Sequence, residues 1–186
     1  GKYYCHLDMG VLGRHNAMNA LAASAAAWMM GIPGETVSKG IQSFHGAGRR
    51  MEFKGKFHGA DVYDDYAHHP NELHALLQAV RLMRYRRVIC AFQPHTYSRT
   101  KALFQDFVDE LRTVDQAVLA DIYAAREQNT VGISSQDLAA EIPGAVYCPS
   151  LQGVTAYLRG IAQPGDIILT VGAGDIYKAG EALLTE

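Results

Sequence analysis

The sequence predicts an α/β protein: a three-layer α/β/α sandwich with a mostly parallel, Rossmann-like sheet, preceded by a helical segment. From residue 61 onward, short apolar runs alternate with segments of helical periodicity. Several of the apolar runs are unbroken, which is typical of strands in a parallel sheet that is covered on both faces. The 186 residues, 48% of them hydrophobic, suffice for a sizeable core.

The N-terminal part predicts two helices. GKYYCHL at residues 1–7 is interpreted as a short aromatic strand that starts abruptly, as if residues preceded it. Asn16 can cap an Ala-rich helix that ends at residues 31–33, and residues 35–44 form a second helix.

The Gly-rich turn that follows predicts a domain boundary. Glycines at 46 and 48 end the helical pair, and residues 51–62 then alternate with glycines at 55 and 59, as in a β-hairpin. We therefore expect one unit at residues 1–45 and another at 46–186.

The second unit is expected to be a series of strands and helices with right-handed crossovers. The predicted strands are DVYDDY (61–66), RRVICAF (86–92), QAVLADI (116–122), AVYC (145–148) and DIILTVG (166–172). The predicted helices are residues 70–83, 99–112, 134–142, 151–161 and a last one after residue 174. Pro70 suits a first helical turn, where its missing N–H costs nothing.

Charge and cysteine content limit the function classes. A net charge of −2 and a pI near 6.5 provide no basic field for nucleic acid or a membrane surface. The apolar residues 17–30 are too few to span a bilayer. Cys5, Cys90 and Cys148 are odd in number and lie in apolar surroundings, so they are interpreted as buried thiols of a reducing, cytoplasmic compartment.

Two strand ends carry the candidate site. VYDDYAHHP (62–70) and FQPHTYSRT (92–100) each run from an apolar strand into a polar turn, where α/β sheets build their ligand sites. One helix joins them, so we expect the two strands to be neighbours. Asp64, Asp65 and the histidines at 68, 69 and 95 are compatible with metal ligation, with a ribose-binding carboxylate, or with helix capping.

Other polar motifs are weaker. Asn16 and Asn19 share one face of a first helical turn, with His15 just before them, and capping by Asn16 is the simpler explanation. Paired Arg49 and Arg50 usually lie on a solvated turn, although they could bind a phosphate. GAGD (172–175) lacks the complete G-x-G-x-x-G and predicts a tight strand-to-helix turn. GxxxxGK[ST] does not occur in the sequence.

Taken together, five blocks resemble the Mur ligases. They are HNAMNALAASAA, GAGRRMEFKG, DDYAHHPNEL, FQPHTYSRT and GAGDIYKAGEALL, and they extend over nearly the whole sequence. The resemblance is to members that join L-alanine to UDP-N-acetylmuramate, with ATP and Mg²⁺, in cytoplasmic peptidoglycan synthesis. ATP first forms an acyl phosphate, which the amine then attacks.

The resemblance also implies a domain assignment. Residues 1–45 correspond to the end of a central ATPase domain, and 46–186 to the Mur ligase C-terminal domain. The UDP-sugar domain and the phosphate loop would lie in missing N-terminal and central domains, which would bind most of the ATP and Mg²⁺. The chain alone is therefore expected to be inactive.

The resemblance implies the following site residues. His15, Asn16 and Asn19 face adenine, Asp65 accepts from the ribose, and Arg50 is the catalytic residue at the terminal phosphate. The residues expected to bind the alanine and the sugar-linked carboxylate are Tyr66, His68, His69, His95 and Arg99. Many relatives have arginine where this chain has Thr96.

Three alternatives stay open. One is the Mur ligase that recycles murein tripeptide, which carries a different block at the position of FQPHTYSRT. The others are a metal-dependent hydrolase that uses the aspartates and histidines, and a nucleotide-binding module without catalysis.

Overall fold

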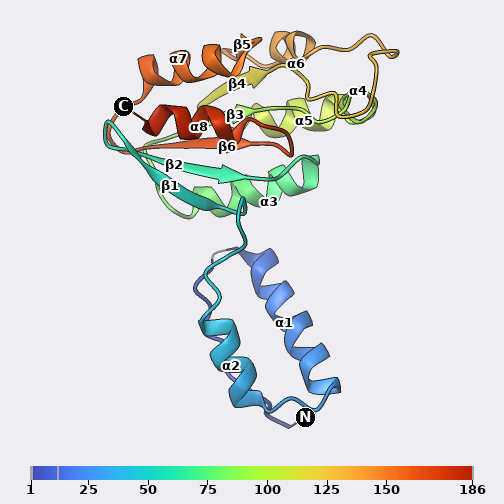
Figure 1. Cartoon of the computed structure of the whole chain (residues 1–186), viewed down its shortest axis with the longest axis vertical. Coiled ribbons are helices and arrows are strands. Elements are labelled where there is room, and N and C mark those ends of the chain that lie inside the picture. Colours follow the sequence, from blue (N-terminus) through green and yellow to red (C-terminus); the bar gives the residue numbers. More distant parts are fainter. Residues whose placement is uncertain (1, 12, 186) are drawn as a thin grey trace. The chain divides into compact units, whose positions relative to one another are not determined.

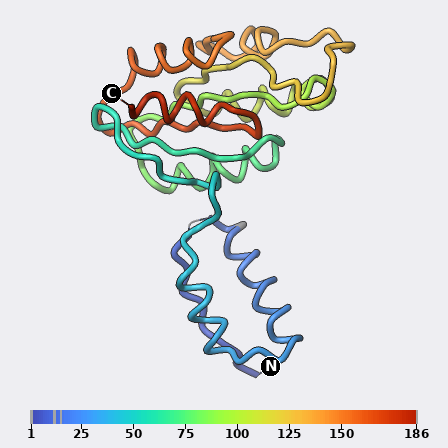
Figure 2. Tube along the Cα trace, in the orientation of Figure 1, coloured from blue at the N-terminus to red at the C-terminus, as the bar shows by residue number. Residues whose placement is uncertain are grey.

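The structure, a computed structural model, describes residues 2–11 and 13–185. The chain divides into two compact units, residues 1–48 and 49–186 (Figure 1). Figure 2 follows the Cα trace through both units. No helix among the described residues is long and apolar enough to cross a membrane.

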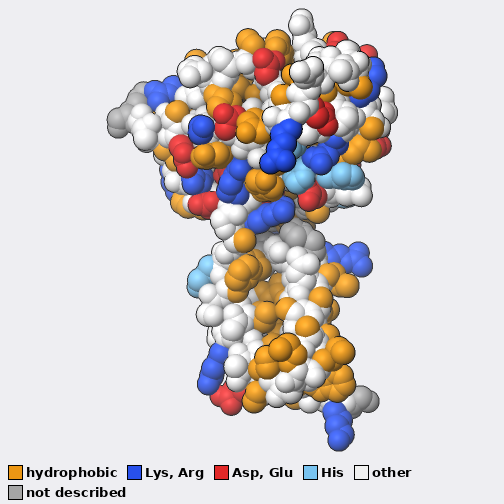
Figure 3. Space-filling model, turned by 45° about the vertical axis from the view of Figure 1, so that its right-hand side comes forward, with side chains coloured by type: hydrophobic (Ala, Val, Ile, Leu, Met, Phe, Trp, Pro, Cys, Tyr) orange, Lys and Arg blue, Asp and Glu red, His pale blue; other side chains and the backbone are white. Residues whose placement is uncertain are grey.

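The first unit contains two helices, α1 (Arg14–Met29) and α2 (Gly34–Gln42). Ala20 and Ser24 of α1 and Val37 of α2 are buried. Many other side chains of this unit are apolar and exposed, as the lower part of Figure 3 shows. The larger ones on and after α1 are Met18, Leu21, Trp28, Met29 and Met30.

Two predictions for this unit are wrong. Residues 2–9 form no strand; instead the Tyr4 hydroxyl donates to Ile32 O at 2.6 Å, and the Ser38 hydroxyl donates to His6 O at 2.5 Å. A strand requires a partner strand, and the described part of this unit contains only helices. Asn16 does not cap α1, because the helix begins two residues earlier and Gly13 occupies the N-cap position.

The second unit is built on one six-stranded sheet. Its strands are β1 (Glu52–Phe57), β2 (Ala60–Asp65), β3 (Arg87–Phe92), β4 (Gln116–Ala120), β5 (Val146–Cys148) and β6 (Asp166–Val171). The order is β1-β2-β6-β3-β4-β5, with β1 antiparallel to β2 and all other neighbours parallel. The predicted hairpin and parallel sheet are confirmed.

Helices cover both faces of this sheet, so the predicted three-layer sandwich is confirmed. They are α3 (Pro70–Arg81), α4 (Tyr97–Ala102), α5 (Phe104–Leu111), α6 (Ser135–Glu141), α7 (Leu151–Ile161) and α8 (Tyr177–Leu184). Leu73, Phe107 and Leu138 bring α3, α5 and α6 into one core cluster, while Val154 and Leu183 bring α7 and α8 into the other.

Two details differ from the predictions. The helix expected at 99–112 is divided at Leu103, whose φ of −113° and ψ of 26° are not helical. The strands β2 and β3 are not neighbours, because β6 lies between them. A helical crossover can pass over a strand position, and every residue of β6 is buried, as suits the middle of a covered sheet.

The cysteines are free thiols: Cys90 and Cys148 are buried and Cys5 is half-buried. Burial raises the pKa of Cys90 to about 12, so this thiol is unreactive at neutral pH.

Candidate active site at the carboxyl edge of the sheet

The loops that follow β2, β6 and β3 are joined to one another at the carboxyl edge of the sheet. The amide of Gly172, after β6, donates to Asp65 O at 3.0 Å. The amide of Gln93, after β3, donates to Val171 O at 2.9 Å. Because β6 lies between the other two strands, its GAGD turn connects the two polar motifs. The two polar motifs therefore meet at one edge of the sheet, with the GAGD turn between them.

A fourth strand end contributes Tyr123. His95 pairs with Tyr123 as an isolated parallel bridge, in which Tyr123 N donates to Pro94 O at 2.8 Å and Thr96 N donates to Tyr123 O at 2.9 Å. The two aromatic rings stack with centroids 5.5 Å apart. The Tyr123 ring thus packs against one face of the His95 imidazole.

Aromatic and imidazole rings form a continuous series at this edge. The rings of Tyr66 and His68 lie 5.5 Å apart, and those of His68 and His95 lie 5.8 Å apart. His68 Nδ1 lies 3.0 Å from Tyr66 O, which fixes the orientation of its ring. Three of the residues predicted for the acceptor side therefore converge, although they come from two strands that are not adjacent.

His95 and Arg99 each have a buried nitrogen without a hydrogen-bond partner among the described residues. These atoms are Nδ1 of His95 and one terminal guanidinium nitrogen of Arg99. Burial lowers the pKa of His95, and the charges of Arg99 and His68 lower it further. A neutral imidazole next to a guanidinium suits an anionic or acceptor-bearing ligand, because buried donors without partners are costly.

Glu127 holds the loop after β4 against the start of α4. Its carboxylate accepts from the Ser98 amide at 2.9 Å and from the Ser98 hydroxyl at 2.5 Å. These hydrogen bonds lower the pKa of Glu127. The carboxylate also lies close enough to Arg99 for its own pKa to respond to that charge.

His69 has a different place from the other histidines. It is the N-cap of α3, and its Nδ1 accepts from the Asn71 amide at 3.3 Å. The helix then begins with Pro70 at its first position, as expected. Helix capping was one of the three interpretations left open for the DDYAHHP motif, and it applies to His69. The predicted contact of His69 with substrate is untested.

Both carboxylate oxygens of Asp65 accept from backbone amides. Oδ2 accepts from Met51 N and Oδ1 from Ala67 N, both at 2.8 Å. The residue is 6% exposed, and burial raises its pKa against the opposing effect of these hydrogen bonds and of the Arg50 charge. Asp65 therefore has a structural task at this edge, and its predicted contact with ribose is untested.

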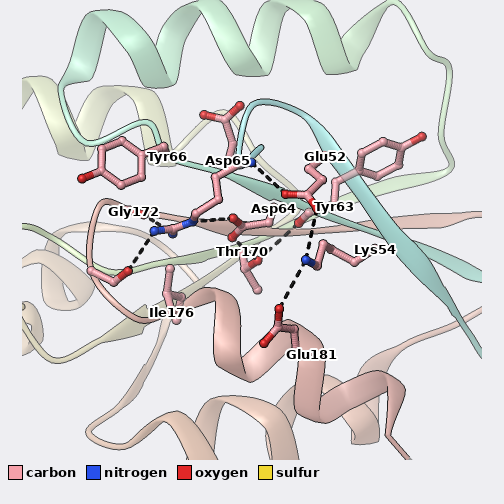
Figure 4. Close-up of polar contacts among 12 residues, drawn as sticks. Glu52, Lys54, Tyr63, Asp64, Asp65, Tyr66, Thr170, Gly172, Ile176 and Glu181 are labelled. Atoms are coloured by element: carbon pink, nitrogen blue, oxygen red, sulfur yellow. Dashed lines mark hydrogen bonds and ion pairs between the residues drawn. The ribbon is translucent and has the colours of Figure 1, made fainter. Parts of the chain in front are cut away.

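The paired arginines differ from each other. Arg50 is exposed, as expected for a solvated turn. The same expectation is wrong for Arg49, whose side chain is 25% exposed and forms an ion pair with Asp64, which is 1% exposed. The carboxylate of Asp64 also accepts from the Thr170 hydroxyl at 2.8 Å. In Figure 4, Asp64, Thr170 and Gly172 lie close together beneath Tyr66.

The GAGD sequence forms the predicted tight turn between β6 and α8. A Cβ at Gly172, where φ is 150°, would lie 2.7 Å from Gln93 O, and a Cβ at Gly174 would lie 2.3 Å from Gln93 Oε1. The Gln93 side chain occupies this space because it donates to Asp175 Oδ1 and accepts from Ile176 N, both at 3.1 Å. Close backbone approach therefore explains both glycines.

The residues predicted to face adenine belong to the first unit. Asn16 and Asn19 lie in the first turns of α1, Asn16 half-buried and Asn19 exposed. The side chain of His15 lies outside the described part of the structure. The metal-site interpretation receives no geometric support: no group of three His, Cys, Asp or Glu side chains within the described residues is arranged to hold a metal ion.

The family is decided by comparison of the sequence. The model of the Mur ligase, glutamate ligase domain, matches residues 49–174. The chain belongs to the Mur ligase family. This match, with the relatives that cover the whole chain, confirms the resemblance to the Mur ligases.

Relatives in this family are similar in sequence to this chain over nearly its whole length. It is 43% identical over 190 aligned residues to the UDP-N-acetylmuramate–L-alanine ligase of Caldanaerobacter subterraneus, covering 100% of this chain and 41% of the relative. It is 47% identical to the ligase of the same name from Lachnospira eligens, covering 96% of this chain and 40% of the relative. The chain therefore spans about two fifths of the length of these Mur ligases.

A solved structure supports the fold. The crystal structure of UDP-N-acetylmuramate–alanine ligase from Thermotoga maritima superposes with a TM-score of 0.81 at 25% identity, over 99% of this chain and 40% of that one.

Sequence reasoning assigned no role to Gln93 or Tyr123, and it did not pair Arg49 with Asp64. Gln93 directly follows β3 and Tyr123 lies three residues after the end of β4, so their position was a usable signal. Arg49 and Asp64 offered no such signal of a shared task, because only the fold brings them together.

Proposed function

We propose that this chain is the C-terminal part of an ATP-dependent ligase that joins L-alanine to the lactyl carboxylate of UDP-N-acetylmuramate in cytoplasmic peptidoglycan synthesis. It acts together with the other regions of the full-length ligase, which correspond to the parts of the relatives that this chain does not cover. The first unit contains residues 1–45, which we assign to the central ATPase domain, and it contributes to the nucleotide site. The second is the C-terminal domain.

The observation that carries this proposal is a pair of buried nitrogens, on His95 and Arg99, that have no hydrogen-bond partner among the described residues and lie beside His68 in a Mur ligase fold. A carboxylate would satisfy the guanidinium nitrogen, and a neutral imidazole can orient an amine or a carboxylate by hydrogen bonding. Both reactants of the proposed ligation carry a carboxylate, which is the chemistry that this cluster accommodates.

On the acceptor side, Tyr66, His68, His95 and Arg99 position the alanine and the sugar-linked carboxylate, and His69 borders them from the start of α3. This face contributes binding and orientation, which turn a reaction of two substrates into one of fixed geometry. Thr96 carries no charge, so Arg99 supplies the guanidinium for the carboxylate.

On the nucleotide side, His15, Asn16 and Asn19 face the adenine and Asp65 faces the ribose. Arg50 approaches the terminal phosphate, where a fixed guanidinium stabilises charge as the phosphoryl group moves to form the acyl phosphate. The chain itself lacks a phosphate loop. We assign the β- and γ-phosphates and Mg²⁺ to the regions that the chain does not cover.

The boundary near residues 46–49 is the proposed hinge. Acyl phosphates hydrolyse readily, so closure of the second unit over the rest of the ligase would exclude water when the amine attacks.

Alanine-dependent phosphate release tests the proposal. The full-length ligase should release phosphate only with ATP, UDP-N-acetylmuramate and L-alanine, whereas the 186-residue chain should be inactive. Turnover with murein tripeptide in place of alanine would favour the recycling ligase. A comparable rate from the 186-residue chain alone would show that the proposal is wrong.

Kinetics of two variants separate the nucleotide roles. Arg50→Ala should depress kcat more than it weakens ATP binding, at a cost of about 3 kcal/mol, because its partner charge develops during transfer. Asp65→Ala should raise the KM for ATP, because a ribose contact is the same in the ground state and the transition state. An effect on kcat alone would leave Asp65 with only the structural task of holding Met51.

Variants of the acceptor side should affect the other substrates. His68→Ala or Arg99→Ala should raise the KM for alanine or for the UDP-sugar. The affinity for ATP should change by no more than about threefold, because substitutions have nearly independent effects on sites that are far apart. His74→Ala is the matched control, because His74 pairs with Glu110 at 3.0 Å on the surface. One equivalent of Zn²⁺ that survives gel filtration, and is lost in His68→Ala, would favour the hydrolase instead.

A further inference from the structure

Arg49 makes three hydrogen bonds to groups that are distant in sequence. Its Nε donates to Asp64 Oδ2 at 2.8 Å, and its terminal nitrogens donate to Gly172 O at 2.7 Å and Gly174 O at 3.2 Å. Two of the acceptor residues, Asp64 and Gly172, are labelled in Figure 4, where dashed lines mark the hydrogen bonds. One side chain therefore ties the first residue of the second unit to both β2 and the GAGD turn.

Two aromatic rings flank the same guanidinium. Its central carbon lies 4.9 Å from the centroid of Tyr66 and 4.6 Å from that of Tyr177. A planar fork with several donors and a stacking face is required for this set of contacts, and a lysine ammonium cannot reproduce it.

The backbone beside Arg49 is held on both sides. Arg49 N donates to Glu52 Oε2 at 2.7 Å, Tyr66 N donates to Arg49 O at 2.8 Å, and Met51 N donates to Asp65 Oδ2 at 2.8 Å. The φ angles of Arg49 and Met51 are 57° and 47°. Left-handed conformations of such residues persist only where the surroundings hold them.

Arg50 lies between these two fixed residues. Its side chain is exposed, and its guanidinium lies 5.8 Å from the centroid of the same Tyr66 ring that Arg49 contacts. The neighbouring arginines therefore have separate tasks: one is held in the second unit, and the other is presented to solvent from a turn of fixed shape.

We propose that Arg49 is a positioning residue that fixes the turn at residues 49–51 and thereby sets the position of the Arg50 guanidinium at the transferred phosphate. This inference rests on the proposed function of Arg50. In the proposed closure, Arg49 keeps its hydrogen bonds to β2 and the GAGD turn, so the position of Arg50 relative to the second unit does not change. Misplacement of a catalytic group by about 1 Å can cost on the order of 100-fold in rate.

The test must separate positioning from stability. Removing Arg49 alone would leave the buried charge of Asp64 without its partner, which destabilises the fold. The double variant Arg49→Met with Asp64→Asn removes both charges, and the asparagine oxygen can still accept from Thr170. Arg84→Met, at an exposed arginine in the turn between α3 and β3, is the matched control.

Two measurements test the positioning, one on the full-length ligase and one on the 186-residue chain. The first is kcat and KM for alanine-dependent phosphate release by the full-length ligase. The second is the rate of tryptic cleavage after Arg50 in the 186-residue chain, located by mass spectrometry, which does not depend on ligase activity. Thermal melts of the 186-residue chain identify folded variants.

For the double variant we expect a cooperative melt, a kcat lowered at least tenfold with the KM for alanine unchanged, and cleavage after Arg50 at least tenfold faster. Arg49→Lys should retain part of kcat, and it replaces the double variant if that variant does not fold. An unchanged kcat in an active ligase would overturn the inference. If the wild-type ligase shows no turnover, the proposed function fails, and the cleavage rate alone tests whether Arg49 fixes the turn. Cleavage after Arg50 that is faster in the double variant than in wild type supports this role of Arg49, and an unchanged cleavage rate overturns it.

Discussion

Gly174→Ala tests the close packing of the GAGD turn. The added Cβ would lie 2.3 Å from Gln93 Oε1, 2.7 Å from Tyr123 Cγ and 2.8 Å from Tyr123 Cβ. Carbon atoms in favourable contact lie about 3.5–4.0 Å apart, so the neighbours must move. The Gln93 side chain can rotate away only by giving up its hydrogen bonds to Asp175 and Ile176.

The magnitude follows from two contributions. Forcing an extra carbon into a packed site costs about 1–3 kcal/mol. Leaving the buried Ile176 amide without its acceptor costs about 1–3 kcal/mol more. The variant should therefore lose roughly 2–6 kcal/mol of the free energy of unfolding, and its Tm should fall by about 6–18 °C at roughly 3 °C per kcal/mol for a unit of this size.

Thermal unfolding of the 186-residue chain, followed by circular dichroism, measures this loss. Gly160→Ala is the matched control, because Gly160 is exposed in α7 and a Cβ there would meet nothing within 4 Å. Alanine favours a helix interior over glycine by about 1 kcal/mol, so the control should melt slightly higher than wild type. An unchanged Tm for Gly174→Ala would refute the packing argument.

Three further predictions concern stability. Residues 49–186 expressed alone should give one cooperative thermal transition, because the sheet and both core clusters lie within them; a product without such a transition would place the boundary elsewhere. Because the pKa of His95 is lowered in the folded protein, its neutral imidazole contributes to the free energy of unfolding above the usual histidine pKa of about 6.5. This contribution is lost as the pH falls through the lowered pKa. Denaturant titrations should therefore show a smaller loss of stability between about pH 7 and 5 for His95→Gln than for wild type or the exposed control His58→Gln, and equal losses in all three would contradict the assignment. Thr96 has a φ of 70° and a ψ of 142°, a strained backbone for a β-branched residue. Thr96→Gly should raise the free energy of unfolding by about 1 kcal/mol, since strain of about 1–3 kcal/mol exceeds the added entropy of the unfolded chain, whereas Thr96→Val should not; a lower midpoint for the glycine variant would argue against strain.

The sequence by itself determined the elements of the second unit and most of their bounds. Apolar runs such as DIILTV predict covered strands, and Pro70 marks the start of α3, because periodicity and backbone chemistry act over a few neighbouring residues. The family likewise follows from short blocks of sequence.

Only the tertiary structure decided the strand order and the use of individual side chains. The position of β6 between β2 and β3 depends on how whole elements pack, which no local pattern encodes. Arg49 and Gly172 are 123 residues apart in sequence, yet they share a hydrogen bond. Asp65 and His69 resemble ligand-binding residues in the sequence, but nearby backbone amides are donors to both side chains. Local sequence fixes what each segment can form, whereas the partners of its polar groups depend on contacts that only the complete fold creates.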